Sequence, residues 1–170
     1  MVDLGCWPGG WLQVTAAAVG ASGRVVGVDV AAIDPPIAFE NVIAFQGDLA
    51  EPSVVTKLLD ALGGPADVLL CDAAPKLTGV RDADRANEAA LLEAVERVLP
   101  RLLRPGGDAL IKILESAEAQ AVDKRLRARF ARAKSFKPGA SRPGTRERYL
   151  LAFGFRASPG RGETKGPASA

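Results

Sequence analysis

The chain has 170 residues, of which 48% are hydrophobic and 25% are charged, and its formal net charge is +2. This size and composition predict a single globular domain, and the small net charge does not by itself indicate a nucleic-acid partner. There are no histidines and two cysteines, which excludes Ser-His and Cys-His catalysis, argues against a metal site or a disulfide scaffold, and favours a reducing, cytoplasmic compartment.

Strand-like and helix-like segments alternate along the chain, which is typical of a parallel sheet with crossover helices. The expected strands are residues 2–4, 24–29, 41–46, 67–71, 109–114, 134–137 and 147–155. The expected helices are residues 10–19, 53–62, 87–103 and 117–132, the second of them capped by Ser53. The predicted domain covers residues 1–155, with its first strand cut short. Residues 156–170 are expected to form a disordered basic tail of Gly, Pro and Ser.

Four aspartates, Asp3, Asp29, Asp48 and Asp72, each end or directly follow an apolar strand. Ligands of open parallel sheets bind beyond the carboxyl ends of the strands, and acids gathered there are costly unless a ligand or hydrogen bonds satisfy them. Asp29 ends the second strand, where an acid binds ribose hydroxyls in dinucleotide-binding folds. For any one of the four, a helix cap or a loop-forming role is the alternative.

A glycine turn separates the first strand from the first helix. Its pattern, Gly5-x-Trp7-x-x-Gly10, carries a tryptophan where the dinucleotide-binding fingerprint has a glycine. A bulky residue there hinders a pyrophosphate from approaching the backbone, and the phosphate-cradling pattern G-x-x-x-x-G-K-[ST] does not occur. The turn therefore predicts a nucleoside-type ligand without a pyrophosphate. S-adenosylmethionine (SAM) fits, because strand-end carboxylates favour its sulfonium cation.

A lysine interrupts the apolar strand expected at residues 109–114. Strands of parallel sheets are usually buried on both faces, so Lys112 is costly to desolvate and is a candidate general base. The alternative is a position near the strand end whose ammonium reaches solvent.

A basic loop enters the last strand. Arg142, Arg146 and Arg148 surround the single acid Glu147, and arginines suit phosphate binding. The alternative is a solvated charged turn with weak local ion pairs. The segment expected to be helical before this loop adds basic residues that could extend the same positive surface: Lys124, Arg125, Arg127, Arg129 and Arg132.

Several motifs, taken in chain order, resemble those of the FtsJ-type ribosomal RNA 2′-O-methyltransferases over residues 2–155. They are Asp3-Leu4-Gly5-x-x-Pro8-Gly9-Gly10-Trp11, Gln46-Gly47-Asp48, Cys71-Asp72-Ala73-Ala74-Pro75 with Thr78-Gly79, Leu103-x-Pro105-Gly106-Gly107 with Lys112, and Ser141-Arg142-x-x-Thr145-x-Glu147-x-Tyr149. The resemblance implies a Rossmann-like α/β methyltransferase fold: a mostly parallel twisted sheet, helices on both faces and an antiparallel final strand. It also implies SAM-dependent 2′-O-methylation of large-subunit (23S) ribosomal RNA, on a uridine.

The family uses a Lys-Asp-Lys-Glu catalytic set, and the resemblance assigns three of its members to Asp72, Lys112 and Glu147. The first lysine of the set lies upstream of the first strand in the family and has no counterpart here. The cofactor residues implied are Asp3, Gly5, Pro8, Gly9, Gly10, Trp11, Asp29, Asp48 and Asp72. The RNA-binding residues predicted are Lys76, Arg142, Arg146 and Arg148, although Lys76 stands where the family usually has asparagine.

Two other functions remain open at this level. Without the first lysine, the chain could be a module that binds SAM and RNA but does not turn over, and the fold also suits a small-molecule O-methyltransferase. The expected partner is RNA, either ribosomal RNA or an assembled subunit. We expect a monomer with no membrane partner, because no apolar run approaches the roughly 20 residues of a membrane span.

Overall fold

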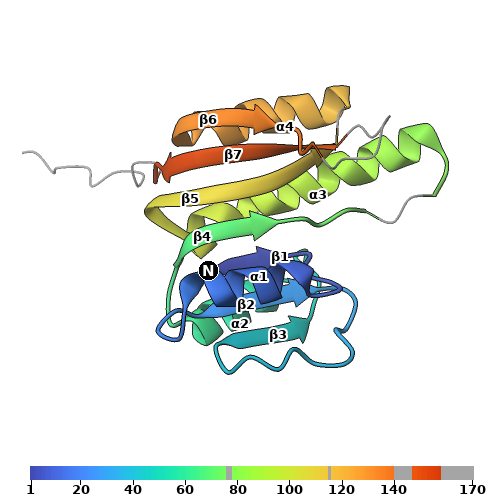
Figure 1. Cartoon of the computed structure of the whole chain (residues 1–170). Coiled ribbons are helices and arrows are strands. Elements are labelled where there is room, and N and C mark those ends of the chain that lie inside the picture. The colour runs from blue at the N-terminus through green and yellow to red at the C-terminus, as the bar shows by residue number, and fades with distance from the viewer. Residues whose placement is uncertain (76–77, 115, 140–146, 158–170) are drawn as a thin grey trace, which may run out of the picture.

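The computed structural model describes residues 1–75, 78–114, 116–139 and 147–157. These residues form a seven-stranded sheet with helices on both faces (Figure 1). The strands are β1 (Val2–Leu4), β2 (Val25–Asp29), β3 (Val42–Gln46), β4 (Ala66–Cys71), β5 (Leu103–Leu114), β6 (Phe130–Phe136) and β7 (Glu147–Phe155). The helices are α1 (Gly10–Val19), α2 (Pro52–Leu62), α3 (Arg81–Leu102) and α4 (Ala117–Ala128).

The strand order is β3-β2-β1-β4-β5-β7-β6. Strands β3, β2, β1, β4 and β5 pair in parallel, whereas β7 runs antiparallel to both of its neighbours. The predicted fold class, a mostly parallel sheet with an antiparallel final strand, is therefore confirmed. The chain builds outward from β1 to β3 and then continues from β4 on the other side of β1. A switch of this kind leaves a crevice at the carboxyl ends of β1 and β4.

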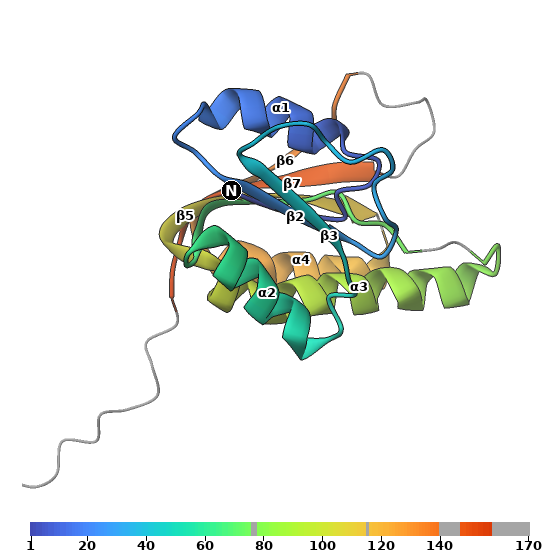
Figure 2. The ribbon, with the colours of Figure 1, turned by 90° about the horizontal axis from the view of Figure 1, so that it is seen from below.

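The two faces of the sheet are covered differently. Helices α2, α3 and α4 lie on one face and α1 on the other (Figure 2). One row of paired residues across the sheet, Leu4, Cys71, Ile111 and Leu150, is almost completely buried on the side of the three helices. The next row, Asp3, Leu70, Leu110 and Leu151, faces α1, and its last two residues are only half-buried. The α1 face of β5 and β7 is therefore partly open to solvent.

Helix α3 packs an apolar stripe beneath the sheet. Its buried side chains recur at helical spacing, which places them on one stripe: Leu92, Val95, Val98, Leu99 and Leu102. Each large side chain buried in this way contributes about 1.5–3 kcal/mol to folding. A helix was predicted here, but it begins at Arg81 rather than at residue 87. Asp82 and Asp84 lie in its first turn, where acids are stabilised by the helix dipole, and Asp84 also accepts the backbone N–H groups of Thr78 and Gly79.

The expected boundaries of α2, β5, α4 and β6 were also wrong. Helix α2 begins at Pro52 after Glu51 and has no side-chain cap, so Ser53 is not its cap; proline suits a first helical turn because its missing N–H would have no partner there. Strand β5 begins at Leu103 rather than at residue 109. Helix α4 ends at Ala128, and β6 then starts at Phe130, whose ring packs 5.4 Å from that of Phe155.

The tail expected at residues 156–170 lies outside the described residues from residue 158 onward. Within the described part of the chain, none of the helices has the length and apolar character needed to cross a membrane.

Candidate active site

A lysine and an aspartate meet at the carboxyl ends of β4 and β5. The Lys112 side chain is only 9% exposed, and its Nζ donates a hydrogen bond to the backbone oxygen of Asp72 at 2.6 Å. The same Nζ lies 3.2 Å from Oδ1 of Asp72. The backbone N–H of Asp72 in turn donates to the oxygen of Leu4 at 3.1 Å, which fixes the residue at the end of β1. Because an ammonium has three N–H groups, this arrangement leaves one for a further acceptor.

Tyr149 completes this group, and sequence reasoning did not place it among the catalytic residues. It pairs with Lys112 across β5 and β7, and its hydroxyl donates to Oδ1 of Asp72 at 2.8 Å. Its ring stacks on that of Trp11, with the centroids 5.8 Å apart. Burial, followed by the hydrogen bond to Asp72, raises the pKa of Tyr149, so the phenol stays protonated and acts as a donor. Trp11 thus connects the first turn of α1 to the lysine–aspartate pair.

Glu147 lies at the same edge of the sheet but is not joined to the pair. It is two residues before Tyr149 in β7 and therefore shares its face, and its negative charge is one of the causes that raise the pKa of Tyr149. Among the described residues, no ion pair connects Glu147 with Lys112. The structure thus brings Asp72 and Lys112 into contact and leaves Glu147 beside them.

A small cleft of about 100 Å³ opens next to this group, between the ends of β1, β2 and β4. Asp29 and Asp48 both line it, and each also shapes its own loop. Oxygens of Asp29 accept from the backbone N–H groups of Trp7 at 3.0 Å and Ala31 at 2.8 Å, and Oδ1 of Asp48 accepts from that of Ala50 at 2.8 Å. Asp29 and Asp48 therefore line the cleft, where a ligand could contact them, and also hold their own loops, which was the alternative role. The lining consists of Gly5, Val28, Asp29, Val30, Gly47, Asp48, Leu49, Ala73, Ala74 and Leu91.

Asp3 is a buried carboxyl group in the centre of the sheet. It is 0% exposed, and neither of its oxygens has a hydrogen-bond partner in the described structure. Burial, followed by the negative charges of Asp72 and Asp29, raises its pKa to about 7. A buried acid without partners is costly. Its position between two further carboxylates favours a cationic group beside it.

The glycine turn allows two chain segments to meet closely. Gly5 has a φ of +78°, and a Cβ built on it would lie 2.4 Å from Cα of Ala73. The turn therefore contacts the loop that carries Asp72. Gly9 caps α1 in the left-handed region, Gly10 is the first residue of α1, and the bond between Trp7 and Pro8 is cis. Pro8, Gly9, Gly10 and Trp11 do not line the cleft itself.

Comparison with known proteins decides the family. A model described as FtsJ-like methyltransferase matches residues 1–155. The chain belongs to the FtsJ-like methyltransferase family. A Pseudomonas aeruginosa protein named ribosomal RNA large subunit methyltransferase E is similar to it, with 41% identity over 157 residues, which cover 92% of this chain and 74% of the relative.

Solved structures agree on the fold of this FtsJ-like methyltransferase. A crystal structure from Plasmodium falciparum, titled as a ribosomal RNA methyltransferase, is 25% identical with a TM-score of 0.77, and the match covers 91% of this chain and 85% of that one. Human methyltransferase-like protein 13, solved in complex with SAH, is 15% identical with a TM-score of 0.58 over 94% of this chain and 72% of that one. The second likeness concerns the fold alone.

Most of the predicted RNA-binding residues of the FtsJ-like chain lie in segments that the structure does not describe. Lys76, Arg142 and Arg146 lie outside the described residues. Arg148 is described, and it lies away from the lysine–aspartate pair. It lies between Glu147 and Tyr149 in β7 and so points to the opposite face, where it donates to Asp123 at 2.9 Å and to Ser135 at 2.7 Å. We assign it a structural role between α4, β6 and β7.

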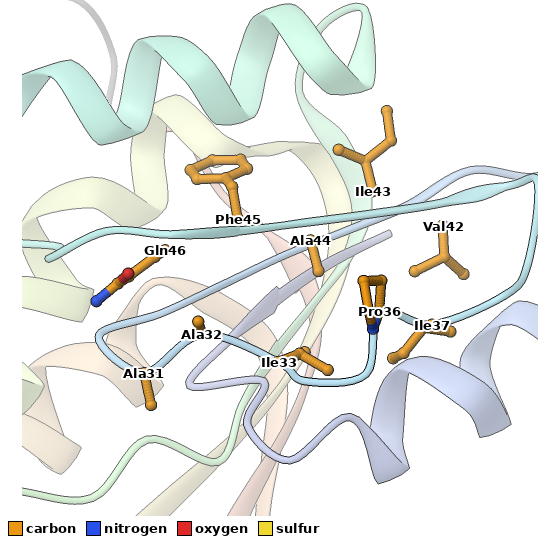
Figure 3. A pocket seen from close by; sticks show the side chains of 10 residues that line it. All are labelled: Ala31, Ala32, Ile33, Pro36, Ile37, Val42, Ile43, Ala44, Phe45 and Gln46. Carbon is orange, nitrogen blue, oxygen red and sulfur yellow. The ribbon is translucent and has the colours of Figure 1, made fainter.

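A second hollow lies at the far edge of the sheet, away from the lysine–aspartate pair. Its volume is about 360 Å³, and it is enclosed by the segment after β2 and by β3 (Figure 3). Its lining is mainly apolar and includes Ile33, Ile37 and Val42. None of the predicted site residues lines it, so we do not include it in the candidate active site.

Replacing Gly5 with alanine should destabilise this FtsJ-like methyltransferase by about 3 kcal/mol, because the new methyl group meets backbone and the residue keeps a positive φ. Chemical denaturation of the two proteins measures the change. Gly10→Ala is the matched control: a Cβ at Gly10 meets nothing within 4 Å, and alanine favours a helix, so its stability should stay equal or rise by up to about 1 kcal/mol. Equal stability of the two variants would contradict the close approach.

Proposed function

We propose that this chain transfers the methyl group of SAM to the ribose 2′-hydroxyl of RNA, and that its substrate is a uridine of large-subunit (23S) ribosomal RNA. The observation that carries the proposal is the contact between Lys112 and Asp72, whose Nζ and Oδ1 are 3.2 Å apart. The two residues after Asp72, Ala73 and Ala74, line the cleft that Asp29 and Asp48 also line. The name of the Pseudomonas relative supports the choice of RNA.

The residues around the cleft fit SAM. Asp29 ends β2, where an acid suits the ribose hydroxyls, and Asp48 lies across the cleft for the base. The carboxyl of Asp3 has no hydrogen-bond partner in the described structure, and with Asp72 it favours a cationic ligand. Gly5 keeps the turn close to Ala73 and leaves the cleft open above it. When bound, SAM would supply a methyl group on a sulfonium, and an oxygen nucleophile can attack that carbon in line while the sulfur leaves as a neutral thioether.

The residues of the chain then act on the other reactant. Lys112 Nζ, held by the backbone oxygen and the carboxylate of Asp72, would orient the 2′-hydroxyl through its remaining N–H group, or would take the hydroxyl proton after losing one of its own. Tyr149 holds the carboxylate of Asp72 through its own hydrogen bond, so the lysine keeps one position. Glu147, at the same edge, adds negative charge near the incoming ribose. Much of the rate enhancement would come from such positioning.

We infer that the chain acts in the cytoplasm as a monomer, on ribosomal RNA or on an assembled subunit. Both of its cysteines are buried and free, which fits a reducing compartment.

The decisive experiment incubates the protein with methyl-tritiated SAM and two substrates, purified large-subunit RNA and large ribosomal subunits. We expect label in the RNA and, after nuclease digestion and mass spectrometry, a 2′-O-methylated nucleoside. Label on base atoms, or no labelled RNA, would contradict the proposal. SAM binding without any transfer would point to a module that binds but does not turn over. Activity on small alcohols that does not change with salt would favour a small-molecule O-methyltransferase, since RNA-directed activity weakens with salt.

Asp29→Ala should lower the affinity for SAM by about 10- to 100-fold, because it removes a charged acceptor from the cleft. Isothermal titration calorimetry measures the affinity, and a melting curve verifies that the loop held by Asp29 is still folded. Asp60→Ala, an exposed carboxylate on α2, is the matched control and should bind SAM like the unchanged protein. Unchanged affinity in the Asp29 variant would remove Asp29 from the site.

A further inference from the structure

The edge strand β6 carries a row of basic and aromatic side chains on the face of the candidate active site. Arg132, Lys134 and Phe136 alternate along β6, and each is exposed. They pair with Phe153, Leu151 and Tyr149 of β7, respectively. Paired residues share a face of the sheet, so this row points to the same side as Tyr149 and Trp11. We call these three residues the β6 row.

Among the described residues, no acid forms an ion pair with the two cations of the β6 row, Arg132 and Lys134. On α4, Arg125 is ion-paired with Glu96 at 2.8 Å, and Arg127 with Asp123 at 3.0 Å. By contrast, within the described ranges neither Arg132 nor Lys134 has a carboxylate oxygen within 4.0 Å. The guanidinium of Arg132 lies 5.3 Å from the centroid of the Phe153 ring, which holds it flat against the sheet. Of the positive surface expected from the sequence, the part on α4 is therefore partly neutralised by ion pairs, whereas the part on β6 keeps its charge.

The aromatic end of the row adjoins the lysine–aspartate pair. Phe136 is 50% exposed, and its partner Tyr149 stacks on Trp11 and bonds to Asp72. An exposed phenylalanine next to two cations without an ion pair to a described acid is the combination that single-stranded nucleic acids bind, with bases stacked on the ring and phosphates on the cations. Lys134 and Arg132 are two residues apart, about 7 Å along a strand, so they can contact separate phosphates. The half-buried Leu151 and Phe153 leave this face open.

We propose that the β6 row binds the RNA strand that flanks the target nucleotide, with Phe136 stacking a base and with Lys134 and Arg132 contacting phosphates. This inference rests on the proposed function, since it extends the same site. It places the RNA path along the edge of the sheet. The sequence had assigned RNA binding to Lys76, Arg142, Arg146 and Arg148, of which only Arg148 is described, and it faces the opposite side.

The test measures binding of a fluorescein-labelled single-stranded RNA of about 12 nucleotides by anisotropy at several salt concentrations. Lys134→Ala and Arg132→Ala should each weaken binding about 3- to 10-fold. Each should also reduce the slope of log affinity against log salt by about 0.7, because one phosphate contact is lost. Phe136→Ala should weaken binding about 5- to 100-fold with little change in slope.

Two exposed residues away from the row provide matched controls. Lys57 lies on α2, on the other side of the sheet, and Phe39, which is 44% exposed, precedes the opposite edge strand β3. Lys57→Ala and Phe39→Ala should bind RNA like the unchanged protein. If the row variants behave like these controls while the unchanged protein binds RNA, the β6 row is wrong and the proposed function stands. If the unchanged protein does not bind this RNA, the β6 row is also wrong, and the transfer of labelled methyl to large-subunit RNA and subunits decides the proposed function separately.

Discussion

Replacing Lys112 with alanine is expected to lower the rate of methyl transfer by about a thousandfold, while SAM binds almost as tightly as before. The lysine is the only residue of the described site with an ammonium next to Asp72, and general acid–base groups of this kind contribute about 10²–10⁴-fold. Lys112 does not line the cleft between Asp29 and Asp48. Its loss should therefore affect the reaction and spare the binding of the cofactor.

Single-turnover transfer of labelled methyl to large-subunit RNA measures the first quantity, and calorimetry with SAM measures the second. Lys57→Ala removes an exposed lysine from α2 and should leave both unchanged. A large loss of SAM affinity in the Lys112 variant would show that the lysine belongs to the cofactor pocket. Near-normal transfer would show that Asp72 or another group carries the proton.

Part of the site could be predicted because its residues follow strands with clear patterns. Asp72 directly follows a short apolar run, and Lys112 interrupts another, so both were expected at the carboxyl edge of the sheet. Since β4 and β5 are neighbours in parallel, the two side chains meet there. The sequence patterns of β1, α1 and β7 were equally clear, and the bounds predicted from them agree with the structure.

The roles of Tyr149 and Arg148 could not be read in the same way. Both follow Glu147 in one motif, but residues of a strand alternate between faces, so Tyr149 meets Asp72 and Arg148 meets Asp123 behind the sheet. Which of the two faces the site depends on the pairing of β7 with β5, and that register joins segments far apart in the chain. The pair of Lys112 with Tyr149 would be enough to fix the register of β7 against β5. The sequence alone does not show that these two residues pair.

The boundary between α4 and β6 was missed for a different reason. Residues 128–134 are mostly alanine and basic residues, which suit a helix by propensity. Pairing with β7 and the contact between Phe130 and Phe155 outweigh this preference. The error matters for function, because it hid the alternation that places Arg132 and Lys134 on the face of the site.

The buried Asp3 should make the protein without SAM less stable as the pH rises. Burial raises its pKa from the ordinary 3.8 to about 7 in the folded state, so between these values the folded chain holds a proton that the unfolded chain has lost. Stability from this group is complete below about pH 4 and falls by about 1.4 kcal/mol per pH unit until about pH 7. The full change is about 4 kcal/mol. Asp3→Asn cannot ionise, so this part of the slope should disappear.

Urea denaturation from about pH 4 to pH 8 compares the unchanged protein, Asp3→Asn and the exposed control Asp60→Asn. Subtracting the curves removes the contribution of the other groups, and equal slopes in all three would show that Asp3 does not titrate in this range.

Bound SAM should offset the loss of folding stability caused by ionised Asp3 if the cationic part of SAM lies near this residue. A positive charge there favours the ionised carboxylate and lowers the pKa of Asp3, so binding at about pH 6 should release a proton to the buffer. Calorimetry in buffers of different ionisation enthalpy detects that proton, and Asp3→Asn should release none and bind SAM more weakly. Proton release that persists in the variant would assign it to another group. The absence of release in both proteins would place the cation away from β1. Ionised Asp3 would then lower the stability of the protein without SAM and help to bind SAM when it is present. Such a role would explain why the sheet keeps an acid at this buried position.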